Sequence, residues 1–441
     1  MTDATLRSRE LWQYSALAMP VAFAGFPLYV LAPDYYATTH GVSISLLGLL
    51  LLGLRLFDAI QDPFIGAMSD RYRRASKWFM GTAAIVLCVS MYGLFNTMPI
   101  QPAIWFLICI AVAVTAYSVL SINLNTLGSL WTPDSQAQTR ITTWRESLGL
   151  VGLVVAVSLP SLLKDWVGQS QTYFYFSIAL SACMGVAWLA FRPWLSANLL
   201  QRKLETNTSA SIFSGIAAIT NQTRRFLGIY GLSMLASAIP AVLVIFFVRD
   251  LLGAESLTGL FLLLYFLSGA LSMPMWKWIS RRYGKYQAWV AAMLLAVASF
   301  IWAFFLGAGD VWQYAMICAF SGFALGADLA LPPSILADHI HQNTKESNAA
   351  SHYALLALAA KLSLALASAI ALPLLGKAGF IPATQNSDTS LMFLSTVYAL
   401  IPCALKLAAA VLLARLFIYS NQGDTHENRQ ANRNIRNSRH A

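Results

Sequence analysis

Long apolar segments recur along the whole chain, and they restrict its fold more than any other feature. A helix that crosses a membrane needs roughly 20 mostly apolar residues. The polar and apolar alternation that is typical of membrane-spanning strands is missing. The sequence therefore predicts an all-α membrane protein with twelve transmembrane helices. We place them at residues 11–32, 44–67, 78–95, 103–128, 144–163, 172–191, 226–248, 257–279, 287–307, 311–334, 350–376 and 391–418.

The composition agrees with lipid as the solvent. Of the 441 residues, 58% are hydrophobic and only 11% are charged, whereas a soluble domain carries about 25% charged residues. The first apolar segment follows Arg7 and Arg9 and is too long for the core of a signal peptide. We expect it to remain as the first transmembrane helix.

Lysine and arginine residues predict the orientation of the helices, because positive residues gather in cytoplasmic loops. Here they follow every second predicted helix, as in DRYRR (70–74) and RRYGK (281–285). With the N-terminus inside, the opposite side contains only Lys164, Arg249 and Lys377. We therefore expect both termini in the cytoplasm. The net charge of +10 is then explained by this bias and by anionic lipid headgroups, without nucleic acid.

A polar segment divides the predicted helices into two sets of six. We predict an N-terminal six-helix bundle at 1–195, a cytoplasmic inter-bundle loop at 196–225, a C-terminal six-helix bundle at 226–418 and a disordered cytoplasmic tail at 419–441.

A repeated spacing indicates that the two bundles are pseudo-symmetric. Pro63 is followed seven residues later by DRYRR, and Pro274 is followed seven residues later by RRYGK. In transporters built from duplicated halves, the substrate site lies near the middle of the membrane between the halves. The sequence therefore favours a transporter.

Two aspartates interrupt the second predicted helix. At about 100° per residue, Arg55, Asp58 and Asp62 share one helix face. A charge at the bilayer centre costs roughly 3 kcal/mol, and two carboxylates on one face repel each other unless they share a cation or a proton. We interpret Asp58 and Asp62 as a cation-coupling site, with Arg55 offsetting one charge. An ion pair with Lys361 or Arg145 is the structural alternative.

The second half serves as an internal control for this interpretation. Under the repeated spacing, Asp58 and Asp62 correspond to Gly269 and Met273. The predicted scaffold therefore does not require acids at these positions. Acids that are present in only one half, inside a membrane, favour a functional role.

Several motifs resemble those of one transporter family. GAMSDRYRR (66–74) is similar to the loop motif of the major facilitator superfamily. RLFDAIQDPFIG (55–66) resembles the second-helix signature of its glycoside–pentoside–hexuronide:cation symporters, typified by the melibiose carrier. Further matches follow at 117–146, 331–340 and Lys361. The resemblance covers nearly the whole chain and implies the major facilitator fold and cation-coupled transport of a sugar or glycoside.

The resemblance also assigns roles to single residues. It places Lys361 and Arg145 beside the substrate and cation sites. In the fourth-helix motif it places Tyr117 and Ser118 at the site. Ser121 stands where melibiose-type members carry a third acid, and its hydroxyl can still ligate sodium. The implied gating motif, which clamps helices in one access state, consists of Gly66, Asp70, Arg71, Arg73 and Arg74.

Other polar residues lie outside these motifs. Asp328, in the tenth predicted helix, is either a substrate or proton site or a structural acid with a paired cation. Lys406, in the twelfth, is expected to form an ion pair that faces the bundle interior. His339 and His341 are expected in a solvated cytoplasmic loop, and no metal site is predicted.

These observations predict a secondary transporter in the cytoplasmic (inner) membrane. It would couple symport of a small organic solute to H⁺ or Na⁺ by alternating access. Walker A, GxSxG and HExxH motifs are missing, which argues against an ATP-driven pump and against an enzyme. We expect a monomer with no cofactor besides the coupling ion. A proton-coupled exporter of amphipathic compounds and a receptor or scaffold without transport are the alternatives.

Overall fold

Helices form almost all of the structure. The computed structural model describes residues 7–168, 171–201, 219–343, 348–381 and 384–419, and these ranges contain no strand. Of the predicted tail at 419–441, only Tyr419 is described, at the end of a π-helical segment, and the rest lies outside the described residues. So does most of the predicted inter-bundle loop, because α8 continues to residue 201 and α10 begins at residue 221.

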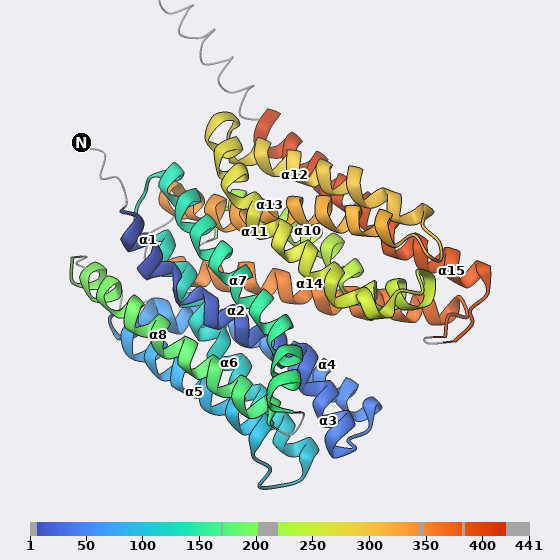
Figure 1. Ribbon diagram of the computed structural model, residues 1–441. Coiled ribbons are helices and arrows are strands. Elements are labelled where there is room, and N and C mark those ends of the chain that lie inside the picture. Colours follow the sequence, from blue (N-terminus) through green and yellow to red (C-terminus); the bar gives the residue numbers. More distant parts are fainter. Residues whose placement is uncertain (1–6, 169–170, 202–218, 344–347, 382–383, 420–441) are drawn as a thin grey trace, which may run out of the picture.

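Each half contains a set of long helices (Figure 1). The N-terminal half consists of α1 (Ser8–Ser15), α2 (Ala18–Phe26), α3 (Ala32–His40), α4 (Ile44–Arg71), α5 (Ser76–Asn96), α6 (Pro102–Ser129), α7 (Ser135–Val167) and α8 (Thr172–Gln201). The C-terminal half consists of α10 (Asn221–Phe246), α11 (Thr258–Tyr283), α12 (Lys285–Phe300), α13 (Val311–Asn343), α14 (Ala349–Lys377), α15 (Asp388–Ser395) and α16 (Ile401–Leu413).

Ten helical segments among the described residues are long and apolar enough to cross a membrane. They correspond to the third to twelfth predicted helices. The second is α4, whose 28 residues span about 42 Å at 1.5 Å per residue. The first is divided into α1, α2 and α3. A π-helical turn at Pro27–Leu31 joins the last two, since proline has no N–H for the regular helical ladder.

The prediction that His339 and His341 lie in a loop is wrong. Both are on α13, which continues to Asn343, and His339 is buried. Hydropathy identifies only the apolar part of a helix. It does not show the helical turns that extend beyond this part and consist of polar residues. For the same reason α7 begins at Ser135, earlier than its apolar segment predicts.

Each half buries its own apolar core. In the N-terminal half, one cluster runs from Leu11 to Leu195 through side chains such as Phe106 and Phe176. In the C-terminal half, one cluster surrounds Trp289 and another contains Phe247 and Tyr398 stacked at 4.0 Å. Two cores of this kind define two helical bundles, α1–α8 and α10–α16, which lie side by side in Figure 1.

The bundles meet mainly where α4 packs along α14 and where α7 packs along α11 and α13. Residues near the end of α4 contact the start of α14, while Arg55, earlier in α4, donates to Ser368, later in α14. The two helices are therefore antiparallel. We call the end at which α4 ends and α14 begins the Asp70 end.

Candidate coupling site between the two bundles

Lys361 of α14 reaches across the interface to both predicted coupling acids on α4. Its Nζ lies 2.7 Å from Asp58 Oδ1, and 2.8 and 2.7 Å from the two oxygens of Asp62. It also donates to Ser118 Oγ on α6 at 2.8 Å, and Ser118 in turn donates to Asp58 at 3.1 Å. One ammonium therefore joins three helices from two bundles.

The local sequence explains why these side chains meet. Asp58 and Asp62 are one turn apart on α4, so both carboxylates project from the same face. Asp58, Asp62 and Lys361 all lie near the middle of their helices, far from either end. The carboxylates are 2% and 0% exposed, whereas the lysine side chain is 21% exposed. The cluster is thus buried between the bundles, near the middle of the helices that carry it.

Two buried carboxylates share the ammonium of Lys361 in this cluster. Like charges this close repel each other, and a bound small cation or a proton on one of them relieves that repulsion. Oxygen ligands suit hard cations, and Asp58, Asp62 and Ser118 supply oxygens within one cluster.

Two polar residues that the sequence analysis did not single out support Asp58. Gln61 Nε2 donates to Asp58 Oδ1 at 3.1 Å, and Thr115 Oγ1 donates to Gln61 Oε1 at 2.8 Å. Thr115 precedes Ser118 by about one helical turn, so both face α4 from α6. The sequence contained one indication for each of them. Gln61 is a polar residue between the two acids, and Thr115 is a second hydroxyl residue about one turn from Ser118.

The structure separates the two cations proposed as partners of the acids. Lys361 contacts them, whereas Arg145 on α7 pairs with the adjacent Glu146 at 2.6 Å and is 3% exposed. Arg55 Nη1 donates to Ser368 Oγ on α14 at 3.2 Å.

The two other predicted residues on α6 differ in position. Tyr117 lies beside α2, where a Cβ at Gly25 would be 3.6 Å from its ring. Ser121, one turn beyond Ser118, contacts neither acid nor Lys361 among the described residues; its carbonyl accepts from Asn125.

Asp328 belongs to a second buried polar cluster, inside the C-terminal bundle. Its carboxylate accepts from Trp289 Nε1 at 2.8 Å and pairs with Lys406, and both charged residues are less than a tenth exposed. Lys406 also donates to Ser233 Oγ and Ser237 Oγ at 2.9 and 3.0 Å. The expected ion pair of Lys406 is confirmed, and Asp328 is its partner.

The predicted gating motif lies at the Asp70 end. Asp70 accepts from Ala350 N, Ser351 N and Ser351 Oγ on α14 at 2.7–2.9 Å, and from Arg73 at 3.0 Å. A Cβ at Gly66 would lie 2.6 Å from Ala354 Cβ, so only glycine permits this approach of α4 to α14.

The basic residues of the motif differ from one another. Arg71 lies over the ring of Tyr72 at the surface, and Arg73 is buried beside Asp70. The side chain of Arg74 lies outside the described residues.

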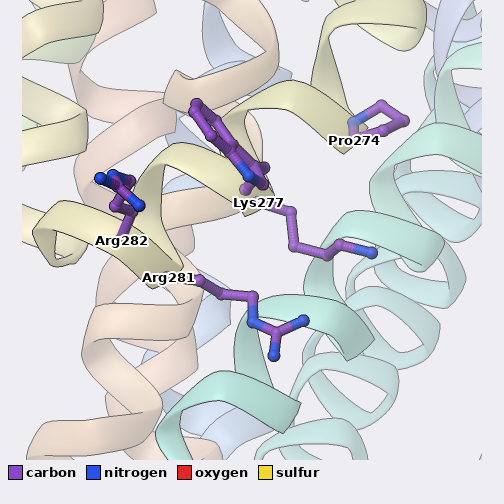
Figure 2. Close-up of a pocket in the computed structure, with 5 residues that line it drawn as sticks. Pro274, Lys277, Arg281 and Arg282 are labelled. Atoms are coloured by element: carbon purple, nitrogen blue, oxygen red, sulfur yellow. The ribbon is translucent and has the colours of Figure 1, made fainter.

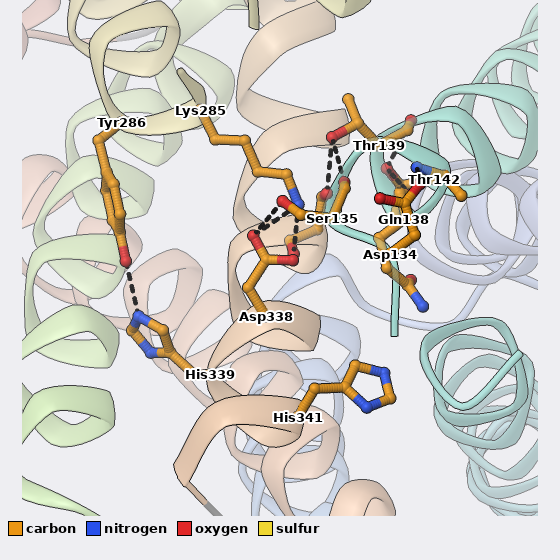
Figure 3. Close-up of polar contacts among 12 residues, drawn as sticks. Asp134, Ser135, Gln138, Thr139, Thr142, Lys285, Tyr286, Asp338, His339 and His341 are labelled. Atoms are coloured by element: carbon orange, nitrogen blue, oxygen red, sulfur yellow. Dashed lines mark hydrogen bonds and ion pairs between the residues drawn. The ribbon is translucent and has the colours of Figure 1, made fainter. Parts of the chain in front are cut away.

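A second polar contact joins the bundles at the same end, on α7 and α13 (Figure 3). Ser135 donates to Asp338 at 2.9 Å, and Lys285 of the C-terminal bundle pairs with the same carboxylate at 2.7 Å. The hydroxyls of Thr139 and Ser334 are 3.0 Å apart. The bundles are therefore held together at the Asp70 end along two separate lines of contact.

Sequence comparison agrees with this architecture. Residues 13–420 match the family of MFS/sugar transport proteins. The symporter YjmB of Bacillus subtilis, itself uncharacterized, is 23% identical over 412 residues, which cover 89% of this chain and 88% of the relative. The glucuronide carrier protein homolog of Escherichia coli is 22% identical over 413 residues, with 89% and 88% covered. The isoprimeverose transporter of Lactiplantibacillus pentosus is 22% identical over 306 residues, with 66% and 62% covered.

Solved structures show the same fold. A bacterial homologue of the iron transporter ferroportin matches with a TM-score of 0.66 at 16% identity, over 93% of this chain and 99% of that one. The fucose:proton symporter of Escherichia coli matches with a TM-score of 0.59 at 14% identity, over 92% and 97%. The predicted major facilitator fold is confirmed, as is the expectation of a transporter and not an enzyme. This multi-pass integral membrane protein belongs to the MFS/sugar transport protein family.

Proposed function

We propose that the protein is a cation-coupled symporter of a sugar or glycoside, with Asp58, Asp62 and Lys361 as its coupling site. The observation that carries the proposal is the position of Lys361. It comes from one bundle and pairs with two acids of the other. Any change in the charge of the acids therefore changes the attraction between the bundles, which is what alternating access requires.

The proposed cycle follows from the charges. Na⁺ or H⁺ binds at Asp58 and Asp62 and weakens their attraction to Lys361. The ammonium is then released from the carboxylates, and α14 can move relative to α4. Solute binds between the halves, as is common in transporters built from duplicated bundles. The loaded bundles then rock, and the contacts at the Asp70 end open.

The hydroxyl nearest to the proposed ion site is Ser118. It contacts both Asp58 and Lys361, so release of Lys361 would free one hydroxyl oxygen beside the carboxylates. We therefore assign the ligand role of the α6 motif to Ser118. Ser121, which the family resemblance favoured, would contribute only if α6 moved relative to α4.

The solute class is proposed from the relatives. Two of them are named for isoprimeverose transport and for a glucuronide carrier. The chain contains no acid near residue 22, where melibiose-type members use an aspartate for sugar hydroxyls. We therefore propose a sugar or glycoside other than a galactoside.

Orientation completes the proposal. Both termini are placed in the cytoplasm of a cell with an inner membrane, on the basis of the distribution of lysine and arginine. The Asp70 end is then cytoplasmic, and the described conformation is closed towards the cytoplasm. We propose that the protein acts as a monomer.

Cation binding can be tested without knowledge of the solute. Thermal unfolding of purified protein is measured in NaCl against choline chloride, and over a pH series. A cation that binds only the folded state raises its stability by mass action. The wild type is expected to be stabilised by Na⁺ or by low pH. Asp62→Asn and Ser118→Ala should lose this stabilisation, whereas Ser121→Ala should keep it.

Coupling is then tested in proteoliposomes. Uptake of isoprimeverose and of a methyl glucuronide is measured with an imposed Na⁺ or pH gradient, for the wild type and for Asp62→Asn. The variant should lose gradient-driven accumulation while it keeps its folded helical content. Undiminished accumulation by the variant would remove Asp62 from the coupling site.

A further inference from the structure

A basic pocket lies on α11 at the Asp70 end of the molecule, away from the coupling site. Its volume is about 560 Å³, within the roughly 300–1,000 Å³ of small-ligand sites. Figure 2 shows Lys277 and Arg281 extending on the side where α7 packs on α11. The lining residues are Pro274, Lys277, Trp278, Arg281 and Arg282.

The repeated spacing relates this pocket to the interface between α4 and α14. The alignment that pairs Pro63 with Pro274 pairs Gly66 with Lys277. At Gly66 the helices touch, since a Cβ would lie 2.8 Å from the carbonyl oxygen of Ala350. A lysine in the equivalent place on α11 has no such close backbone approach to make to α7, and instead lines the pocket.

The same alignment pairs Asp70 with Arg281 and Ser351 with Arg140. Between α4 and α14, the carboxylate of Asp70 accepts a hydrogen bond from the start of α14. Between α7 and α11, the charged neighbours of Lys277 are Arg140 of α7 and Arg281 of α11, and both repel its ammonium. Arg140 donates a long hydrogen bond, at 3.4 Å, to Ser8. Within the described ranges, no carboxylate pairs with these three cations.

The surroundings of the pocket favour a lipid over a soluble anion. Leu271, Met275 and Trp278 follow one another at helical spacing on α11 and are 72%, 51% and 58% exposed. Such a stripe faces acyl chains. Tryptophan is enriched at the level of the headgroups, and it stands here beside the cations. Basic pockets between transmembrane helices bind anionic headgroups.

We propose that the phosphate of an anionic phospholipid binds between α7 and α11. Lys277 and Arg281 of one bundle and Arg140 of the other supply the charges, and the acyl chains lie along Leu271 and Met275. The phosphate joins the bundles at this interface, as Asp70 does at the other.

Native mass spectrometry of the purified full-length protein tests the proposal. Dioleoylphosphatidylglycerol or dioleoylphosphatidylcholine is added, and retention of one lipid is quantified. The wild type should retain the anionic lipid. The double variant K277Q/R281Q should bind it roughly tenfold or more weakly, because each basic residue near an anionic surface contributes substantially. R140Q should also weaken binding, since the site spans both bundles.

Matched variants separate this site from general surface charge. R224Q/R225Q removes two exposed arginines from the first two turns of α10, at the same end of the molecule. It should retain the lipid, as should the charge-preserving K277R/R281K. Equal loss in R224Q/R225Q would overturn the proposal. So would equal retention of phosphatidylcholine, or a thermal stabilisation by inorganic phosphate as large as that by phosphatidylglycerol.

Discussion

Asp70 and Ser351 connect the two bundles through three atoms. Oδ2 of Asp70 accepts from the backbone N–H of Ser351 at 2.8 Å and from its hydroxyl at 2.7 Å. The first N–H groups of a helix have no partner within the helix. The residue before α14, Asn348, forms no side-chain cap, so an acid from the other bundle takes this role. The start of α14 therefore loses its cap whenever the bundles separate at this end.

Removal of this cap should favour the open conformation. Loss of a capping side chain costs about 0.5–2 kcal/mol, and in Asp70→Ala this cost falls only on the closed state. The measurement is the alkylation rate of a cysteine placed at Ile65, which packs on the apolar cluster that contains Ala350, with the native cysteines replaced. We expect faster alkylation in Asp70→Ala.

The control is Asp134→Ala, because Asp134 caps α7 within its own bundle. It should lower thermal stability without exposing residue 65. Equal acceleration in both variants would contradict a specific role of Asp70 in closure.

Gly66 should be essential for closure for steric reasons. An alanine there would place its Cβ 2.6 Å from Ala354 Cβ and 2.8 Å from Ala350 O, so α4 and α14 must separate. Gly53 on the same helix has nothing within 4 Å of an added Cβ. We expect Gly66→Ala to reduce transport strongly, and Gly53→Ala to leave it close to wild type. Uptake in proteoliposomes distinguishes the two, and full activity of Gly66→Ala would show that the contact is dispensable.

The stability of the protein should depend on the charge balance within the coupling cluster more than on the presence of any one of its side chains. Lys361→Gln removes the ammonium that Asp58 and Asp62 share, and loss of one partner from a buried pair costs roughly 3–5 kcal/mol. Asp62→Asn combined with Lys361→Gln removes one charge of each sign and should restore much of the stability. Thermal unfolding of the single and double variants tests this expectation. Additive losses in the double variant would argue against direct coupling.

The pair of Asp328 and Lys406 should be structural. Both lie inside one bundle, so their separation is not required for rocking. Asp328→Asn should lower the unfolding temperature, because Lys406 would keep only serine oxygens and a neutral amide as partners. Stabilisation by the coupling cation should persist in this variant. If cation-dependent stabilisation disappeared, Asp328 would have to be included in the ion pathway.

The basic outline of the fold could be predicted from the sequence, because hydrocarbon imposes length and composition on every helix that crosses it. The two acids of α4 could be found for the same reason: charges inside a membrane are costly and therefore conspicuous. Helix ends were harder to predict. α7 and α13 continue beyond their apolar segments, where hydrophobicity no longer marks the helix.

The sequence reduced the partners of the two acids to two candidate cations, Lys361 and Arg145. Packing decided between them, because it places Lys361 against the acids of α4 and Arg145 against Glu146. Likewise, Ser118 rather than Ser121 reaches Asp58 because one turn of α6 faces α4 at that depth. The sequence by itself determined which residues enter the membrane, through the cost of solvation. The tertiary structure alone decided which of them touch, because contacts between distant segments depend on how whole helices pack.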